Sequence, residues 1–251
     1  MKRLLKLATL LIMSGTLAVA SPRIIVFDVN ETLLDINALI PQFVRIFGDA
    51  NVAQEWFSNV VLYSQVTTLT GPYIDFGSVA RASLKMTAAA HGRPLTQEDE
   101  DEVIKGLVSL PVHPDVREGL EKLRAAGFRM VTLTNSAPAA VEKQLKSAGI
   151  SGYFERNFSV DAVRKFKPAP EVYQQIATEL GVDGSQLRLV AAHAWDIVGA
   201  QRAGWAAAFI ARPGKALYPL GGRSDVVGPD LRDVADQIIK LDTPVSSPVS
   251  R

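Results

Sequence analysis

Residues 23–35, RIIVFDVNETLLD, constrain the fold of this 251-residue chain more than any other segment. Four apolar residues, Ile24 to Phe27, predict a strand buried on both faces, and the polar run from Asp28 marks its end. In an open α/β sheet, ligands bind at the carboxyl ends of the strands. Asp28 is therefore a candidate nucleophile or metal ligand, and Thr32 could hydrogen-bond a bound group. The alternative is that Asp28 only caps the following helix.

The second half of the chain alternates between strand and helix patterns. We expect strands at about 129–133, 158–160, 187–191 and 207–210, with helices between them. This alternation predicts an α/β fold with a doubly wound parallel sheet. Residues 21–35 and 112–242 would form this Rossmann-like core, and the Pro- and Ser-rich residues 243–251 a disordered tail.

Residues 36–111, between the first strand and the rest of the sheet, carry no strong strand signal. Apolar residues recur there at helical spacing, and Gly48 and the Thr70-Gly71-Pro72 run break the pattern. Thr96 starts a further helix with a capping box in which Asp99 replaces the usual Glu. We interpret this block as an all-helical domain inserted into the α/β core.

Composition narrows the possible functions. A net charge of +1 with interspersed signs gives no footprint for nucleic acid. The chain has no cysteine, which excludes disulfides, thiolate metal sites and a cysteine nucleophile. Its three scattered histidines argue against a histidine-rich zinc site.

The amino terminus has the three parts of a secretory signal peptide. Basic residues precede an apolar run from Leu7 to Leu17, and Ala18-Val19-Ala20 forms a small-residue cleavage site. Residues 1–20 therefore predict export to the periplasm or medium, with no membrane attachment after cleavage. The alternative is a cytoplasmic protein whose translation starts at Met13.

Polar groups follow each of the next three predicted strands. Thr134 and Asn135 follow the second strand, Lys167 the third and Asp196 the fourth. Singly, each has a plain structural explanation, as a helix cap, a solvated loop charge or a first-turn acid. Together with Asp28 they favour a common site at one edge of the sheet.

The same residues carry a family resemblance. Asp28-x-Asn-x-Thr32, Thr134-Asn135, Phe166-Lys167-Pro168 and Ala194-Trp195-Asp196 resemble, in order, the four motifs of the haloacid dehalogenase superfamily. The helical block takes the place of that family's cap domain, at residues 36–111. The resemblance implies that Asp28 is the nucleophile.

Asn30 separates two chemistries within the superfamily. Phosphate-ester hydrolases of this superfamily carry Asp-x-Asp as their first motif, and the second Asp is the general acid that protonates the leaving group. A neutral Asn30 cannot donate a proton as a carboxylic acid does. The fourth motif also offers only Asp196, where magnesium-dependent relatives usually present two acids. We therefore expect no metal and no cofactor.

Lys167-Pro-x-Pro-Glu-Val-Tyr173 and Trp195-Asp196 resemble the type II 2-haloacid dehalogenase branch. The resemblance implies attack of Asp28 on C2 of a 2-halocarboxylate, with inversion and an aspartyl ester. It also implies that Lys167 keeps Asp28 ionised, and that Asp196 orients Lys167 and helps to activate water. Supporting positions implied in the same way are Asn30 and Thr32 in the strand-one loop, Thr134 and the Asn135 N–H as binders of the substrate carboxylate, Phe76 and Trp195 as an apolar wall, and Tyr173 as support for Lys167.

Two positions depart from the resemblance. Close relatives carry a halide-binding Arg next to the position of Trp56, where this chain has Phe57, and a phenyl ring offers an anion no charged donor. Relatives also tend to have Asn in place of His193. We expect His193 to take over part of the binding of the leaving halide.

The expected partner is thus a small 2-halocarboxylate, and neither nucleic acid nor membrane. A homodimer stays open, since Trp56 could serve an interface as well as the internal core. Two other functions also stay open: hydrolysis of a phosphate or other ester by the same Asp28, and non-catalytic binding on the same fold.

Overall fold

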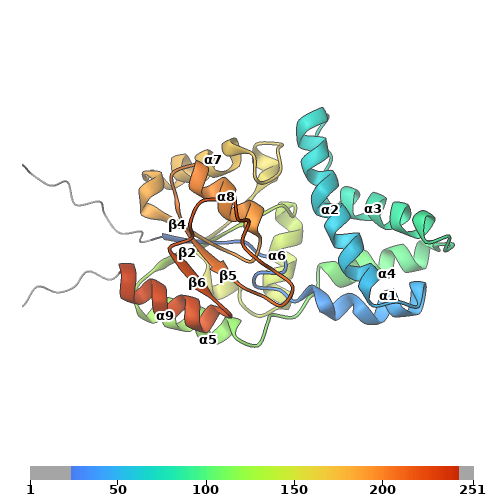
Figure 1. Ribbon diagram of the computed structural model, residues 1–251, viewed down its shortest axis with the longest axis horizontal. Helices are drawn as coiled ribbons and strands as arrows, with labels where there is room; N and C mark the ends of the chain where they lie inside the picture. Colours follow the sequence, from blue (N-terminus) through green and yellow to red (C-terminus); the bar gives the residue numbers. More distant parts are fainter. Residues whose placement is uncertain (1–23, 243–251) are drawn as a thin grey trace, which may run out of the picture.

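The computed structural model of the protein describes residues 24–242 (Figure 1). The predicted signal peptide, the Met13 start and the tail 243–251 lie outside the described residues. None of the helices between residues 24 and 242 combines the length and the apolar character that a bilayer span requires.

The core is a six-stranded parallel sheet with the order β3-β2-β1-β4-β5-β6, which confirms the predicted α/β class. The central strand β1 pairs with β2 on one side and β4 on the other, with Phe27 opposite Thr132 and Val190. The strands are β1 Ile24–Phe27, β2 Arg129–Thr134, β3 Arg156–Ser159, β4 Leu187–Ala191, β5 Ala206–Ile210 and β6 Val226–Gly228.

Helices cover both faces of the sheet. Helices α5 and α9 pack together on one face, while α7 and α8 lie on the other (Figure 1). All four residues of β1 are buried, as their continuous apolar run predicts. The helices of this part are α5 Val116–Ala125, α6 Pro138–Ser147, α7 Pro170–Leu180, α8 Ala194–Arg202 and α9 Leu231–Asp242, with short 3₁₀ helices at Ser151–Tyr153, Val160–Ala162 and Gly184–Gln186.

Three elements differ from the sequence prediction. Strand β3 spans Arg156–Ser159 rather than 158–160, because its first two residues are polar, exposed edge residues that hide the strand pattern. The strand β6 and the helix α9 were not predicted. Three residues are too few for β6 to show a period, whereas the buried residues of α9 do follow a helical repeat: Leu231, Val234, Ala235 and Ile238.

Residues 36–111 form helices and no strand, and they lie beside the sheet (Figure 1). Gly48 ends α1 with φ 78°, a conformation that glycine adopts without steric cost. Thr96 and Asp99 form the predicted capping box of α4. The helices are α1 Ile40–Phe47, α2 Asn51–Thr70, α3 Phe76–Ala90 and α4 Gln97–Leu107, preceded by a 3₁₀ helix at Ile36–Leu39.

Trp56 belongs to the interior of this helical block. Its side chain is fully buried, its ring packs on Phe43, and its Nε1 donates to the Ala80 carbonyl oxygen at 3.0 Å. Trp56 is therefore not available for a dimer interface. Tyr63, on the same helix, is exposed.

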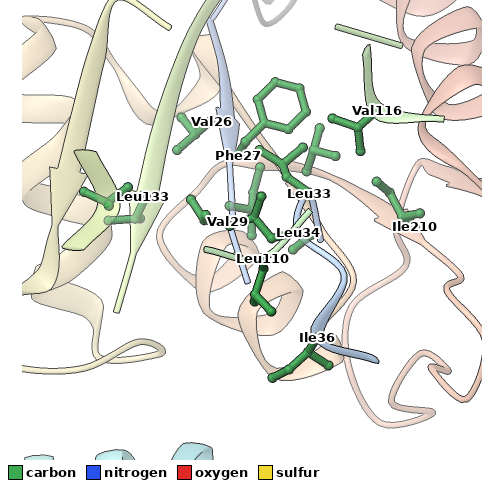
Figure 2. Close-up of a cluster of buried hydrophobic side chains, with 14 of the residues drawn as sticks. Val26, Phe27, Val29, Leu33, Leu34, Ile36, Leu110, Val116, Leu133 and Ile210 are labelled. Carbon is green, nitrogen blue, oxygen red and sulfur yellow. The ribbon is translucent and has the colours of Figure 1, made fainter. Parts of the chain in front are cut away.

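A tight turn after β1 is anchored in the hydrophobic core (Figure 2). The Val29 carbonyl oxygen accepts the backbone N–H groups of Leu33 and Leu34, and all three side chains are buried. Figure 2 shows Leu34 close to Leu110 from the helical block, and Val29 on the side of the turn toward Leu133 from β2. This anchoring fixes the backbone on both sides of the polar residues between Val29 and Leu33.

Candidate active site

Asp28 is the centre of the candidate site. It lies directly after β1 and is almost completely buried, at 4% exposure. Lys167 Nζ donates to its Oδ1 at 2.8 Å, while Thr32 Oγ1 donates to its Oδ2 at 2.6 Å. His193 Nδ1 lies 3.0 Å from the same Oδ2. Thr32 therefore contacts the candidate nucleophile itself.

Lys167 links three strand ends through one ammonium group. Its Nζ contacts Asp28 Oδ1, Asp196 Oδ2 at 2.7 Å and the Leu133 carbonyl oxygen at 3.1 Å. Its backbone N–H donates to Asn135 Oδ1 at 3.1 Å. Because an ammonium has three hydrogens, these contacts use every donor and fix the group in place.

Asp196 is fully buried at the start of α8, and both of its oxygens are engaged. Oδ2 accepts from Lys167, and Oδ1 accepts from the Tyr173 hydroxyl at 2.6 Å. Tyr173 therefore acts on Lys167 through Asp196. The two residues form a rigid support behind the ammonium group.

Burial and neighbouring charges set opposite ionisation tendencies for the two carboxylates. Burial tends to raise the pKa of Asp28, but the positive charges of Lys167 and His193 outweigh it and hold this pKa well below its usual value. Burial and the charge of Asp28 raise the pKa of Asp196 despite Lys167. Burial opposes the charge of Lys167, yet both carboxylates keep its pKa above the usual value. Of the two carboxyl groups, Asp28 therefore has the stronger tendency to ionise.

A second row of polar side chains contacts the other oxygen of Asp28: His193, which the sequence predicted, followed by Glu31 and Lys215, which it did not. His193 Nε2 lies 2.8 Å from Glu31 Oε2, and Lys215 Nζ lies 2.7 Å from Glu31 Oε1. Glu31 is a buried residue with φ 60°, an uncommon conformation for a side chain other than glycine. The sequence signal for Glu31 was its position, a charged residue in the loop directly after the predicted first strand. No sequence pattern indicates that Lys215 contacts it.

His193 is held in its protonated form. Burial tends to lower its pKa, but the charge of Asp28 and the hydrogen bonds to Asp28 and Glu31 raise it to about 9. Both ring nitrogens face carboxylate oxygens, and only the imidazolium can donate to both. Burial tends to raise the pKa of Glu31, yet His193 and Lys215 lower it below its usual value.

A cavity of about 240 Å³ lies beside Glu31, His193 and Lys215. The Trp195 ring lines it and stacks on His193, with 4.8 Å between ring centroids. The remaining lining residues are Glu31, Gln54, Phe57, Ser58, Val61, His193 and Lys215. A ligand here would meet Phe57 and Val61, with the polar Gln54 and Ser58, from α2, and charged groups from the α/β core.

Several predicted site residues contact other groups than expected. Asn30 binds Ser136 Oγ at 3.2 Å and Gln144 Nε2 at 2.9 Å, so its amide is committed to structural contacts. Thr134 Oγ1 accepts the Ser136 N–H at 3.1 Å. Phe76 is buried against Phe57 and Phe166 rather than beside Trp195. The geometry brings together Asp28, Thr32, Asn135, Lys167, Tyr173, His193, Trp195 and Asp196.

Residues 24–242 contain no group of three or more histidine or acidic side chains arranged to hold a metal ion. The fold and the site together define a class of enzyme, a hydrolase with a doubly wound α/β core whose candidate nucleophile is a buried carboxylate paired with lysine. The family model of the haloacid dehalogenase-like hydrolases matches residues 22–204, and the chain belongs to this family.

Known relatives place it in the L-2-haloacid dehalogenase branch. An (S)-2-haloacid dehalogenase from Pseudomonas sp. (strain YL) is 25% identical over 214 residues, 84% of this chain and 92% of the relative. One solved L-2-haloacid dehalogenase is 30% identical with a TM-score of 0.83, covering 87% of this chain and 99% of that one. The Xanthobacter autotrophicus L-2-haloacid dehalogenase with chloropropionic acid covalently bound is 25% identical, with a TM-score of 0.80, covering 86% and 98%.

Proposed function

We propose that this protein hydrolyses the carbon–halogen bond of short (S)-2-haloalkanoic acids through an ester on Asp28. The observation that carries the proposal is Asp28 itself, an almost completely buried carboxylate held by Lys167, Thr32 and His193. A carboxylate stripped of water and fixed in orientation is a strong nucleophile toward carbon. The names of the relatives support the same substrate class.

In the first half-reaction, a carboxylate oxygen of Asp28 attacks C2 from the side opposite the halogen. The new C–O bond forms as the carbon–halogen bond breaks, and the halide leaves with the bonding pair. Configuration at C2 is therefore inverted. Lys167 keeps the nucleophile ionised, and the end of β2 at Thr134 and Asn135 is the expected position of the substrate carboxylate.

In the second half-reaction, water attacks Cγ of Asp28 and releases the 2-hydroxy acid. The family resemblance implied that Asp196 helps to activate this water. In the structure Asp196 is fully buried, and its two oxygens face Lys167 and Tyr173 rather than the cavity. We assign Asp196 the role of positioning Lys167.

The leaving halide needs a positive group that Phe57 cannot supply. The expectation that His193 offers it a hydrogen bond does not fit either, because both ring nitrogens already face carboxylates. Lys215 lines the same cavity as Phe57 and is partly accessible. We propose that the halide departs toward Lys215.

The test is halide release from L-2-chloropropionate by purified residues 21–251 in the presence of a chelator. We expect chelator-resistant release that is lost in Asp28→Asn, a variant of nearly the same size without the nucleophile. A parallel assay with p-nitrophenyl phosphate and Mg²⁺ covers ester hydrolysis. Phosphate release lost in Asp28→Asn, without halide release, would establish phosphatase chemistry instead.

We also propose a cap role for residues 36–111, export through residues 1–20, and a homodimer. Phe57 from α2 faces the cavity of the α/β core, which supports a cap role. Amino-terminal sequencing of the secreted protein tests export. Light scattering tests dimerisation. The large apolar residues that the helical block exposes are Val44, Leu62, Tyr63, Leu69, Ile74 and Met86.

A further inference from the structure

We propose that His193, kept cationic by Glu31, stabilises the negative charge that forms on Asp28 Oδ2 while the ester intermediate is hydrolysed. The proposal rests on the function proposed above and deepens it. It gives a catalytic role to His193 and a positioning role to Glu31. Neither residue is then needed for the halide to leave.

The contacts of Asp28 distinguish its two oxygens. Oδ2 accepts from Thr32 at 2.6 Å and from His193 at 3.0 Å, whereas Oδ1 accepts only from Lys167 among the described residues. A carboxylate oxygen has two lone pairs in the plane of the group. Oδ1 therefore keeps one lone pair for attack on carbon, and Oδ2 becomes the carbonyl oxygen of the ester.

This assignment makes Thr32 and His193 an oxyanion hole. Water attacks Cγ, the carbonyl electron pair moves to Oδ2, and the resulting tetrahedral intermediate carries its charge there. Collapse breaks the bond between Cγ and the substrate oxygen and restores the Asp28 carboxylate. One proton of the water ends on the hydroxyl of the product, and the other leaves to solvent, balancing the departed halide.

The donors on Oδ2 are aimed before the reaction starts. Thr32 Oγ1 accepts the Ala192 backbone N–H at 2.9 Å, which leaves its hydrogen free to point at Asp28. The stacked Trp195 ring fixes the plane of the His193 imidazole. Preorganised donors of this kind stabilise a developing oxyanion without further rearrangement.

Glu31 keeps His193 protonated after the ester has formed on Asp28. The ester is neutral, so His193 loses the charge of Asp28 that favoured its protonation. Glu31 Oε2 stays 2.8 Å from Nε2, and Lys215 holds the other Glu31 oxygen at 2.7 Å. Of the charged groups around the imidazole, Glu31 is then the only anion in contact with it within residues 24–242, and Lys167 and Lys215 are the nearby cations.

The experiment separates the two half-reactions in single turnovers. Enzyme in excess is mixed with L-2-chloropropionate and quenched in acid at intervals. Halide is measured, and the ester on the Asp28 peptide is followed by mass spectrometry. We expect His193→Asn to form the ester and release halide within about threefold of the wild-type rate, but to hydrolyse the ester about 100-fold more slowly.

Glu31→Gln tests the positioning role and serves where His193→Asn does not fold. Gln retains the size of Glu but not its charge, so His193 should lose its proton at lower pH in the ester state. We expect ester hydrolysis in Glu31→Gln to approach the wild-type rate at low pH and to fall at a lower pH than in the wild type. The matched control is His91→Asn, a surface histidine paired with Glu55, which should behave as wild type.

Two results would overturn the proposal. One is ester hydrolysis at the wild-type rate in His193→Asn, or at the wild-type rate and pH profile in Glu31→Gln. The other is equal slowing of ester formation and hydrolysis, which would mean that His193 only holds Asp28 in place. Failure of the proposed function has a different signature, since wild type and His91→Asn would then release no halide at all.

Discussion

Tyr173 donates its hydroxyl hydrogen to Asp196 Oδ1 at 2.6 Å, and Lys167 donates to the other oxygen of the same carboxylate at 2.7 Å. Burial and the charge of Asp196 raise the pKa of Tyr173 well above its usual value, so the phenol stays a donor. The neutral Tyr173 hydroxyl thus holds Asp196 in place, and Asp196 in turn holds the Lys167 ammonium that contacts Asp28. Substitutions at Tyr173 should therefore change catalysis without any contact with substrate.

Tyr173→Phe tests this relationship with the loss of one oxygen atom. It leaves Asp196 Oδ1 buried without a donor, which typically costs about 1–3 kcal/mol. We expect a lower urea midpoint and about tenfold slower ester formation, as Lys167 loses its fixed position. Tyr218→Phe, at an exposed residue, is the control. Unchanged ester formation in Tyr173→Phe would mean that Asp196 needs no second donor.

Gly199→Ala should displace Tyr173, because Gly199 lies directly against the Tyr173 ring. A Cβ atom at Gly199 would lie 2.4 Å from the Tyr173 oxygen and 2.7 Å from its ring, closer than atoms can pack. We expect a loss of about 1–3 kcal/mol in the free energy of unfolding, as is usual for an overpacked core, together with reduced activity. Gly152→Ala, where an added Cβ meets nothing within 4 Å, is the matched control. Equal unfolding midpoints for the two variants would contradict the expected clash.

The sequence predicted the sheet and the Lys167 side of the site because both depend on local patterns. Buried parallel strands are continuous apolar runs, and their carboxyl ends carry the polar residues that meet in space. Asp28, Lys167 and Asp196 were found in this way. The small strand β6 lacked such a pattern, since three residues show no period.

His193 was predicted as a site residue, but its contact with Glu31 was not predictable, because it depends on contacts between distant loops. Glu31 and His193 are 162 residues apart, and the contact needs the uncommon backbone conformation of Glu31. Lys215 lies in a loop without any pattern. The contact of Asn30 with Gln144 was unpredictable for a similar reason, since Gln144 comes from the face of α6 and carries no sequence signal.

Lys167→Met tests the charge balance at the centre of the site. The variant removes the cation between two buried carboxylates and keeps an apolar stem of similar length. Breaking a buried ion pair on one side typically costs about 3–5 kcal/mol, because the remaining charge has no partner. We expect this loss at pH 7 in urea unfolding, a smaller loss at pH 4 as the carboxylates take up protons, and no ester formation at either pH. A loss independent of pH would point to packing rather than charge.

His193 should make stability depend on pH on the alkaline side of neutrality. Its pKa is about 9 in the folded protein and 6.5 in a model peptide, so below pH 6.5 both states carry the proton. Between these values only the folded state does, so stability falls as pH rises. We expect the wild type to lose roughly 3 kcal/mol between pH 6 and 10 beyond any change in His193→Asn. An equal change in the free energy of unfolding of both proteins between pH 6 and 10 would refute this.

Lys215→Met tests where the halide departs. A charge-assisted hydrogen bond contributes about 1.5–3 kcal/mol, so its loss should slow ester formation about tenfold or more and weaken inhibition by added bromide. Lys215→Arg, which keeps the charge, should restore most of both. Lys165→Met, which removes a lysine paired with Glu171 outside this cavity, is the control. Because Glu31 still contacts His193 in the Met variant, ester hydrolysis should change far less than ester formation. Undiminished bromide inhibition in Lys215→Met would place the halide elsewhere in the cavity.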